Sequence, residues 1–224
     1  PGFTRGQNLE KIGQHAGDTS ELFFNDLRVP ADALLGGVEG QGFVQMMREL
    51  PRERLIIGVQ AVHGAKGALD ATLKYVQERQ AFGQPIGQFQ NTRFTLAQCA
   101  SDIAAAEAFL NASVAAYERG ELTPEAASAL KLHTTELFSR VADACLQLFG
   151  GYGYMAEYPI SRFWTDARVL RIYGGTSEIM KELVARSLLG RCAMGNICNR
   201  QRRSWPVIGV AHREQALRAS VGSA

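Results

Sequence analysis

This sequence has almost no net charge, no long apolar run and no clustered cysteines. Its 24 basic and 22 acidic residues leave a formal charge of +2, and the only basic cluster is Arg200-Gln-Arg-Arg203, so we expect no nucleic-acid partner. No run of about 18 apolar residues occurs, which argues against a transmembrane helix. The start of the chain also lacks the layout of a signal peptide. The sequence therefore predicts a soluble, intracellular protein without a membrane span.

The four cysteines do not have the spacing of metal ligands. Two of them lie inside apolar helical patterns, where they are predicted to be reduced core thiols. The sequence therefore predicts no metal site. The cysteines are Cys99, Cys145, Cys192 and Cys198.

Helical periodicity dominates the middle of the chain, and a hydrophobic content of 46% is ample for a buried core. Long helices joined by short loops pack as antiparallel neighbours. The predicted fold class is therefore mainly α, an antiparallel helical bundle. The expected helices cover residues 43–79, 88–118, 124–149, 159–170 and 176–189.

The two ends of the chain differ from this middle part. Residues 1–34 do not show helical periodicity, and the segment from Glu21 to Pro30 predicts a short strand or two. The glycine-rich segment 36–42 predicts a flexible junction. Beyond Gly190 the periodicity is lost. We therefore expect a partial β-domain at 1–35, the helical bundle at 36–190 and an irregular or disordered tail at 191–224.

Two glycine clusters separate predicted helices, Gly150-Gly151-x-Gly153 and Gly174-Gly175. Glycine permits positive φ and lets the backbone approach a ligand closely. The second cluster is followed by Thr176-Ser177-Glu178, in which Thr176 or Ser177 can cap the next helix. A helix start of this kind favours phosphate binding. From local chemistry alone, ligand-binding loops and simple helix-capping turns are equally good interpretations.

Four spaced motifs carry a more specific signal. In order, they read Gln147-Leu-Phe-Gly-Gly-Tyr-Gly-Tyr, Glu157-Tyr-Pro, Asp166-Ala-Arg168 and Ile172-Tyr-Gly-Gly-Thr-Ser-Glu178-Ile. Together they resemble the C-terminal signature of the acyl-CoA dehydrogenase family. The resemblance covers about residues 1–190 and implies that residues 1–35 are the end of a middle β-domain. Because the preceding domains have no counterpart here, the chain resembles a fragment.

The resemblance implies α,β-dehydrogenation of an acyl-CoA thioester to a trans-2-enoyl-CoA. A carboxylate would remove the α-proton while the β-hydrogen leaves as hydride to FAD, and electrons would pass to an electron-transfer flavoprotein. The implied assembly is a homo-oligomer, a dimer or a tetramer. The implied location is the bacterial cytoplasm or the mitochondrial matrix.

The catalytic base of much of the family is a glutamate immediately before Gly-Thr, where this sequence has Gly174. The long-chain and isovaleryl branch instead has a glutamate in a Pro-x-Glu-Arg-Leu context, which matches Pro51-Arg-Glu53-Arg-Leu55. The resemblance therefore implies Glu53 as the base, Arg54 beside the acyl-CoA, and the Gly174 N–H as a donor to the thioester carbonyl. Without it, Glu53 is a solvated glutamate in a charged run and Arg54 a surface ion-pair partner.

The resemblance also implies a set of FAD contacts. An arginine is a bidentate partner for pyrophosphate, and in the family the arginine at position 79 reaches the FAD of a neighbouring subunit. Position 178 is often glutamine in relatives, and Glu178 keeps an acceptor but loses the amide donor. The implied contacts are Arg79, Phe82, Gly83, Gln90, Gln147, Gly151, Thr176 and Glu178.

Two other functions stay open. The chain lacks the part of the β-domain that holds the isoalloxazine ring in the family, so it is also compatible with a non-catalytic helical oligomerisation or binding module. An acyl-CoA oxidase of the same superfamily is the second alternative, distinguished by hydrogen peroxide production.

Overall fold

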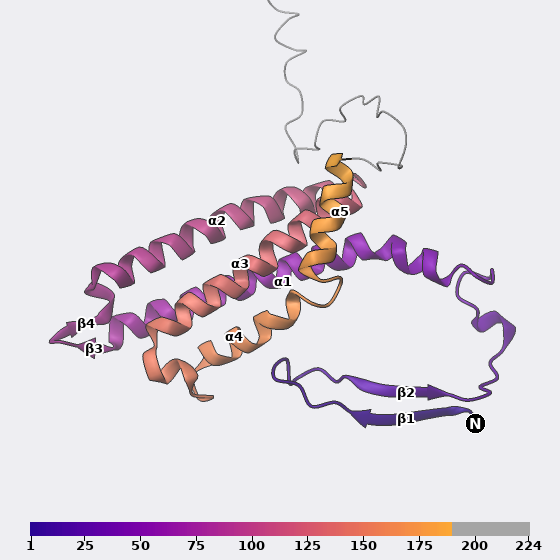
Figure 1. The fold of residues 1–224 in the computed structure, drawn as a ribbon, viewed down its shortest axis with the longest axis horizontal. Coiled ribbons are helices and arrows are strands. Elements are labelled where there is room, and N and C mark those ends of the chain that lie inside the picture. Colours follow the sequence, from indigo (N-terminus) through magenta and orange to yellow (C-terminus); the bar gives the residue numbers. More distant parts are fainter. Residues whose placement is uncertain (190–224) are drawn as a thin grey trace, which may run out of the picture.

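The structure is a computed structural model that describes residues 1–189 (Figure 1). The predicted tail at 191–224, with Cys192, Cys198 and the basic cluster, lies outside the described residues. The two main strands are β1 (Phe3–Asn8) and β2 (Ser20–Phe24), and the helices are α1 (Gly42–Glu78), α2 (Gln90–Glu118), α3 (Pro124–Leu148), α4 (Pro159–Leu170) and α5 (Ser177–Leu189). Short elements join them: η1 (Ala31–Ala33), β3 (Gln80–Ala81), β4 (Gln84–Pro85), η2 (Ile86–Gln88) and η3 (Gly150–Tyr154).

The long helices α1, α2 and α3 lie side by side, while α4 packs against α1 and α3 and α5 crosses α3 (Figure 1). This arrangement confirms the predicted fold class, a mainly α antiparallel bundle. The start of α3 shows why the sequence defined its limits so well. Thr123 Oγ1 accepts a hydrogen bond from the Ala126 N–H at 3.2 Å, and Pro124 occupies the first turn, where its missing donor costs nothing.

The core lies where α1 and α3 face each other. Small residues on α1, including Ala61 and Ala65, leave room for the large side chains of Leu137 and Phe138 on α3, and all four are buried. Cys99 and Cys145 are also buried and free, as predicted. Because the helices interdigitate so closely, the positions of the loops at their ends are set by this packing.

The strands β1 and β2 form an antiparallel hairpin in which Phe3 pairs with Phe24. β2 overlaps the segment from Glu21 to Pro30 in which a short strand or two was predicted, whereas β1 lies before that segment. The loop of the hairpin contacts α4, where an oxygen of the Asp166 carboxylate accepts the Gln14 N–H. Residues 34–41 form turns between the hairpin and α1, and the predicted division into domains stays a prediction.

Within residues 1–189, no helix is long and apolar enough to cross a membrane. The same residues hold no group of three or more histidine, cysteine, aspartate or glutamate side chains arranged to bind a metal ion.

The close approach of α1 and α3 gives a first testable prediction. A Cβ added to Gly64 would lie 2.6 Å from the Phe138 ring, whereas a Cβ added to Gly42 in the same helix would meet no atom within 4 Å. We expect Gly64→Ala to lower the free energy of unfolding in urea by about 1–3 kcal/mol through overpacking. Gly42→Ala is the control and should leave stability unchanged or slightly higher. Equal stabilities of the two variants would contradict this account of the packing.

Candidate functional site

The residues predicted to carry function fall into two groups, one beside the first half of α1 and one at its C-terminal end. Glu53 and Arg79 are separated by about 39 Å along the helix axis, at 1.5 Å per residue. We call the first group the loop site; it contains Glu53, Arg54, Gly174, Thr176 and Glu178. We call the second the pocket site; it contains Arg79, Gln147 and Gly151, which line a cavity, and Phe82, Gly83 and Gln90, which lie nearby.

Arg54 connects α1 to the loop between α4 and α5. Its side chain is only 5% exposed. Its Nε donates to the Gly174 carbonyl at 3.2 Å and its Nη1 donates to Ser128 Oγ at 3.2 Å. Burial lowers the pKa of Arg54, and the neighbouring Glu53 carboxylate partly opposes this shift. The interpretation of Arg54 as a surface ion-pair partner is therefore wrong, because the guanidinium points into the bundle and holds the loop backbone.

Gly174 packs directly against α1. Its φ is +66° and that of Gly175 is +105°, as the glycine pair predicted. A Cβ on Gly174 would lie 2.5 Å from Ile57 Cδ1. Ile57 follows Glu53 by one helical turn, so the two share a face of α1. The structure thus brings the segment around Glu53 next to a loop about 120 residues further along the chain.

The polar groups on the outer side of this loop are free. Glu53 is exposed and its carboxylate has no hydrogen bond or ion pair within residues 1–189. In the same part of the chain, no acceptor binds the backbone N–H groups of Gly174, Gly175 or Thr176. One unpaired carboxylate therefore lies on the helix face that packs against a row of unpaired backbone donors.

The inner side of the loop rests on two residues that the sequence analysis missed. Lys131 is 0% exposed, and its Nζ donates to the Gly175 carbonyl at 2.7 Å. Burial, together with the positive charge of nearby Arg54, lowers the pKa of Lys131 to about 8, although Glu136 opposes the shift. The signal that could have revealed Lys131 is its place in the apolar pattern of α3, immediately after the buried Leu130.

Glu136 joins the two ends of the same loop. Its Oε1 accepts from Arg171 Nε at 2.9 Å and from Ser177 Oγ at 2.6 Å. Burial alone would raise the pKa of this carboxyl, but the two hydrogen bonds and the positive charges of Arg171 and Lys181 together hold the pKa below its ordinary value. Glu136 is therefore charged at neutral pH and closes the loop at both ends.

Of the two predicted capping residues for α5, Thr176 and Ser177, Thr176 is the one that caps the helix. Thr176 Oγ1 accepts the Ile179 N–H at 3.4 Å, whereas Ser177 donates to Glu136 and does not cap. Glu178 is exposed in the first turn, and hydrogen bonds from its own backbone N–H and from the Thr176 hydroxyl lower its pKa. Its negative charge faces the positive end of the helix dipole.

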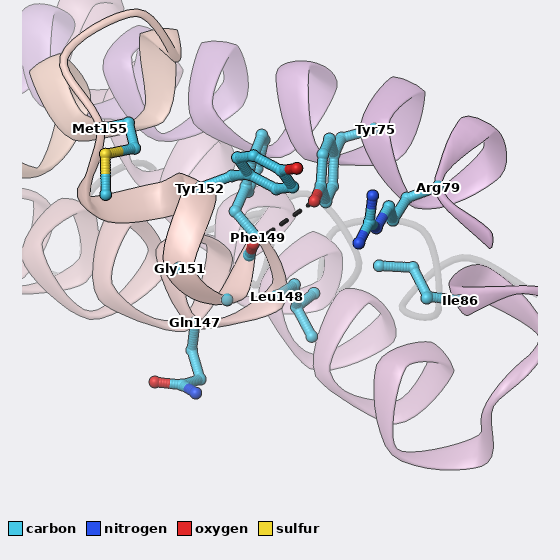
Figure 2. A pocket seen from close by; sticks show the side chains of 10 residues that line it. Tyr75, Arg79, Ile86, Gln147, Leu148, Phe149, Gly151, Tyr152 and Met155 are labelled. Carbon is cyan, nitrogen blue, oxygen red and sulfur yellow. Dashed lines mark hydrogen bonds between the residues drawn. The ribbon is translucent and has the colours of Figure 1, made fainter. Parts of the chain in front are cut away.

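At the C-terminal end of α1, Arg79, Gln147 and Gly151 of the pocket site line a cavity of about 480 Å³ (Figure 2). The Arg79 guanidinium lies 5.2 Å from the centre of the Tyr152 ring. Tyr75 stacks on Phe149 at 4.0 Å and donates its hydroxyl to the Phe149 carbonyl. Burial raises the pKa of Tyr75. The cavity thus has aromatic walls and one guanidinium, while the Gln147 side chain extends away from Tyr75 (Figure 2).

The glycines of the first cluster have different roles. A Cβ on Gly150 or Gly151 would meet no atom within 4 Å, so these positions keep the cavity open. A Cβ on Gly153 would lie 2.6 Å from the Leu146 carbonyl oxygen. Gly153 is therefore needed for backbone packing, whereas Gly150 and Gly151 line the cavity.

The remaining predicted contacts lie on an exposed turn beyond the cavity. Phe82 and Gly83 connect β3 to β4 and both have positive φ, +51° and +78°. Phe82 is 96% exposed and has one aromatic neighbour, Phe89. Gln90, also exposed, begins α2. The structure therefore separates Phe82, Gly83 and Gln90 from the cavity lined by Arg79, although all of them lie at the same end of the bundle.

The part of the chain that forms the helical bundle matches a known family. The family model for the C-terminal domain of acyl-CoA dehydrogenase matches residues 40–189. The chain therefore belongs to the acyl-CoA dehydrogenase family.

Individual relatives agree with this assignment. The chain is 47% identical over 188 residues to the mitochondrial long-chain specific acyl-CoA dehydrogenase of Sus scrofa, covering 84% of this chain and 44% of that protein. The chain thus spans less than half the length of this relative.

Solved structures have the same fold. An acyl-CoA dehydrogenase from Geobacillus kaustophilus superposes with a TM-score of 0.81 at 45% identity, covering 84% of this chain and 49% of that one. A glutaryl-CoA dehydrogenase from Mycobacterium smegmatis, in complex with FADH2, gives a TM-score of 0.80 at 28% identity, covering 87% and 50%.

The tight fit of Gly174 gives a second prediction. Gly174→Ala should lower the free energy of unfolding by about 1–2 kcal/mol because alanine is strained at positive φ. The close contact between the added Cβ and Ile57 should lower it further. Gly83→Ala is a matched control, because Gly83 also has positive φ but open space around it. Urea unfolding should therefore show a larger loss for Gly174→Ala. Equal losses of unfolding free energy in the two variants would mean that the Ile57 side chain can move away from the added Cβ without an energetic cost.

The pKa of Lys131 gives a third prediction. Between pH 8 and 10.5 the unfolded chain keeps a proton on this amine that the folded chain has released, so raising the pH stabilises the folded state. The cost of burying the charge is fully present below pH 8. Relative to Lys131→Met, the wild type should gain up to about 3 kcal/mol across this range.

Urea unfolding at several pH values measures this gain. Lys66, a more exposed lysine paired with Glu107, provides the control variant Lys66→Met. A constant difference between wild type and Lys131→Met over the whole range would show that Lys131 titrates normally.

Proposed function

We propose that this chain carries part of the active site of an FAD-dependent acyl-CoA dehydrogenase. The reaction would convert an acyl-CoA thioester to a trans-2-enoyl-CoA, with Glu53 as the catalytic base. The observation that carries the proposal is the packing of Gly174 against the face of α1 on which Glu53 lies. This packing supports the proposal because the segment around Glu53 lies next to a loop from a distant part of the sequence.

Glu53 is supported as the base by what surrounds Gly174. The loop has no carboxylate at position 174, and Ile57 occupies the space that a side chain there would enter. Glu53 lies one turn before Ile57, is exposed and has no hydrogen-bonding partner within the described residues. A base must be free to accept a proton from the substrate, and this carboxylate is free.

The loop would bind the thioester carbonyl. Removal of the α-proton places negative charge on the carbonyl oxygen, and fixed N–H donors stabilise such charge in water-poor sites. The N–H of Gly174 has no acceptor within residues 1–189, so it is available for this role. Arg54 would remain beside the acyl-CoA, and it holds the Gly174 carbonyl from the inner side.

The residues of the pocket site fit a dinucleotide. Arg79 supplies a cation for a pyrophosphate, and the glycines at 150 and 151 leave the cavity open. Phe82, Gly83, Gln90 and Gln147 would add contacts around this end. FAD, when bound, accepts the β-hydrogen as hydride.

One chain does not bring the pocket site and the loop site together, because about 39 Å of helix separates them. Thr176 and Glu178 at the loop site would therefore contact the FAD that the pocket site of another copy holds. A homo-oligomer, a dimer or a tetramer, follows as part of the proposal. Transfer of electrons to an electron-transfer flavoprotein, and a place in the bacterial cytoplasm or mitochondrial matrix, are proposed from the family resemblance.

One observation favours a non-catalytic binding module. Every residue of β1 and β2 is exposed, so Phe3, Phe23 and Phe24 lie uncovered within the described residues. A hairpin of this kind does not by itself cover a flavin ring. Purified protein that shows no flavin absorbance and takes up no FAD would favour the binding module over the enzyme.

The fourth prediction tests the base. With FAD supplied and flavin content checked, Glu53→Gln should lower dye reduction by an acyl-CoA panel about 10²–10⁴-fold, because the amide cannot accept the α-proton. Glu49→Gln changes an exposed glutamate one turn earlier, which pairs with Arg52, and should keep wild-type activity. If Glu53→Gln stays active, the base is another residue. Hydrogen peroxide produced without the dye would identify an oxidase instead.

A further inference from the structure

Lys131 is a buried charge that the proposed chemistry does not use. Placing an ammonium group in a helical core is costly unless it is paired and hydrogen-bonded. The nearest carboxylate on α3, Glu136, already binds Arg171 and Ser177. The hydrogen bond that Lys131 makes is to a backbone carbonyl, that of Gly175, at 2.7 Å.

Two neighbouring carbonyls of the loop are held in the same way. Arg54 binds the carbonyl of Gly174 from α1, and Lys131 binds the carbonyl of Gly175 from α3. In a trans peptide the N–H points opposite to the C=O. The two cations therefore direct the N–H groups of Gly175 and Thr176 away from the bundle, and neither N–H has an acceptor within residues 1–189.

Glycine makes such a device necessary. Gly174 and Gly175 populate many backbone conformations, and a Gly-Gly peptide rotates readily when nothing holds it. An apolar side chain at position 131 would leave the Gly175 carbonyl buried without a donor, so the loop would turn that carbonyl toward water. The N–H of Thr176 would then turn inward.

We propose that Lys131 is a positioning residue for the loop site, acting through the Gly175 carbonyl and together with Arg54. Together the two cations keep the N–H groups of Gly175 and Thr176, which follow that of Gly174, directed at the thioester carbonyl of the substrate. This role rests on the proposed function, since it assigns those donors to an acyl-CoA.

The fifth prediction compares two ligands that differ in one carbonyl group. trans-2-Dodecenoyl-CoA carries the thioester carbonyl, and the trans-2-dodecenyl-CoA thioether has a CH2 group in its place. With FAD supplied, calorimetric titration of wild type should show tighter binding of the carbonyl ligand. Lys131→Met should reduce this preference roughly 3- to 10-fold, the worth of about one hydrogen bond, whereas Lys66→Met should keep it. A merely structural role would weaken both ligands equally.

Amide hydrogen exchange gives a readout that does not need a ligand. Exchange in segment 171–178 should be faster in Lys131→Met than in wild type, with the rest of the bundle unchanged. Unchanged exchange, or equal weakening of both ligands, would overturn the positioning role while leaving the proposed function intact. A wild-type chain without preference for the carbonyl ligand would overturn the proposed function, and with it the substrate assigned to these donors.

A second variant covers the case in which Lys131→Met does not fold. Ser128→Ala removes one of the two hydrogen-bonding partners of Arg54 and leaves Lys131 in place. It should reduce the carbonyl preference in the same direction and by a smaller factor. An unchanged preference in Ser128→Ala would overturn the joint action of Arg54 and Lys131.

Discussion

Two buried positive charges and two backbone carbonyls determine the shape of the loop between α4 and α5. A carbonyl offers only a partial charge, so Arg54 and Lys131 are stable in the core only while Gly174 and Gly175 turn their oxygens inward. Gly174 and Gly175, in turn, have positive φ, a conformation in which their carbonyls accept hydrogen bonds from these two donors. Helix packing, the loop conformation and the free donors outside are therefore one coupled arrangement, which explains why the loop is compact although it lies at the surface.

Much of the fold followed from local signals. The helices were predicted to within a few residues because periodicity and caps such as Thr123 and Thr176 act over a single turn. Contacts between distant segments do not follow from periodicity. The proximity of Glu53 and Gly174 came from a family resemblance. Lys131 was missed because a lysine in a helix is normally solvated, and its burial is decided by a loop more than 40 residues away.

The length of α1 also explains what the sequence could not show about the cofactor residues. Periodicity predicts a helix, but only its unbroken path shows how far Arg79, at its C-terminal end, lies from Gly174, which packs on Ile57 near its middle. The exposed turn at Phe82 continues this end outward, in a backbone conformation that costs energy for a residue with a side chain. In the proposed oligomer, the loop site and the pocket site of one chain are too far apart to bind the same cofactor. Cofactor binding would therefore require assembly of two or more chains.

The hydrogen bond between Asp166 and the Gln14 backbone joins the hairpin to α4 near the point where that helix ends. Five residues after Asp166, directly past the end of α4, Arg171 donates to Glu136 at the base of the loop. The C-terminal half of α4 therefore contacts the hairpin through Asp166 and leads directly into Arg171 at the base of the loop. The strands and the loop with its backbone donors are thus attached to neighbouring positions of one helix.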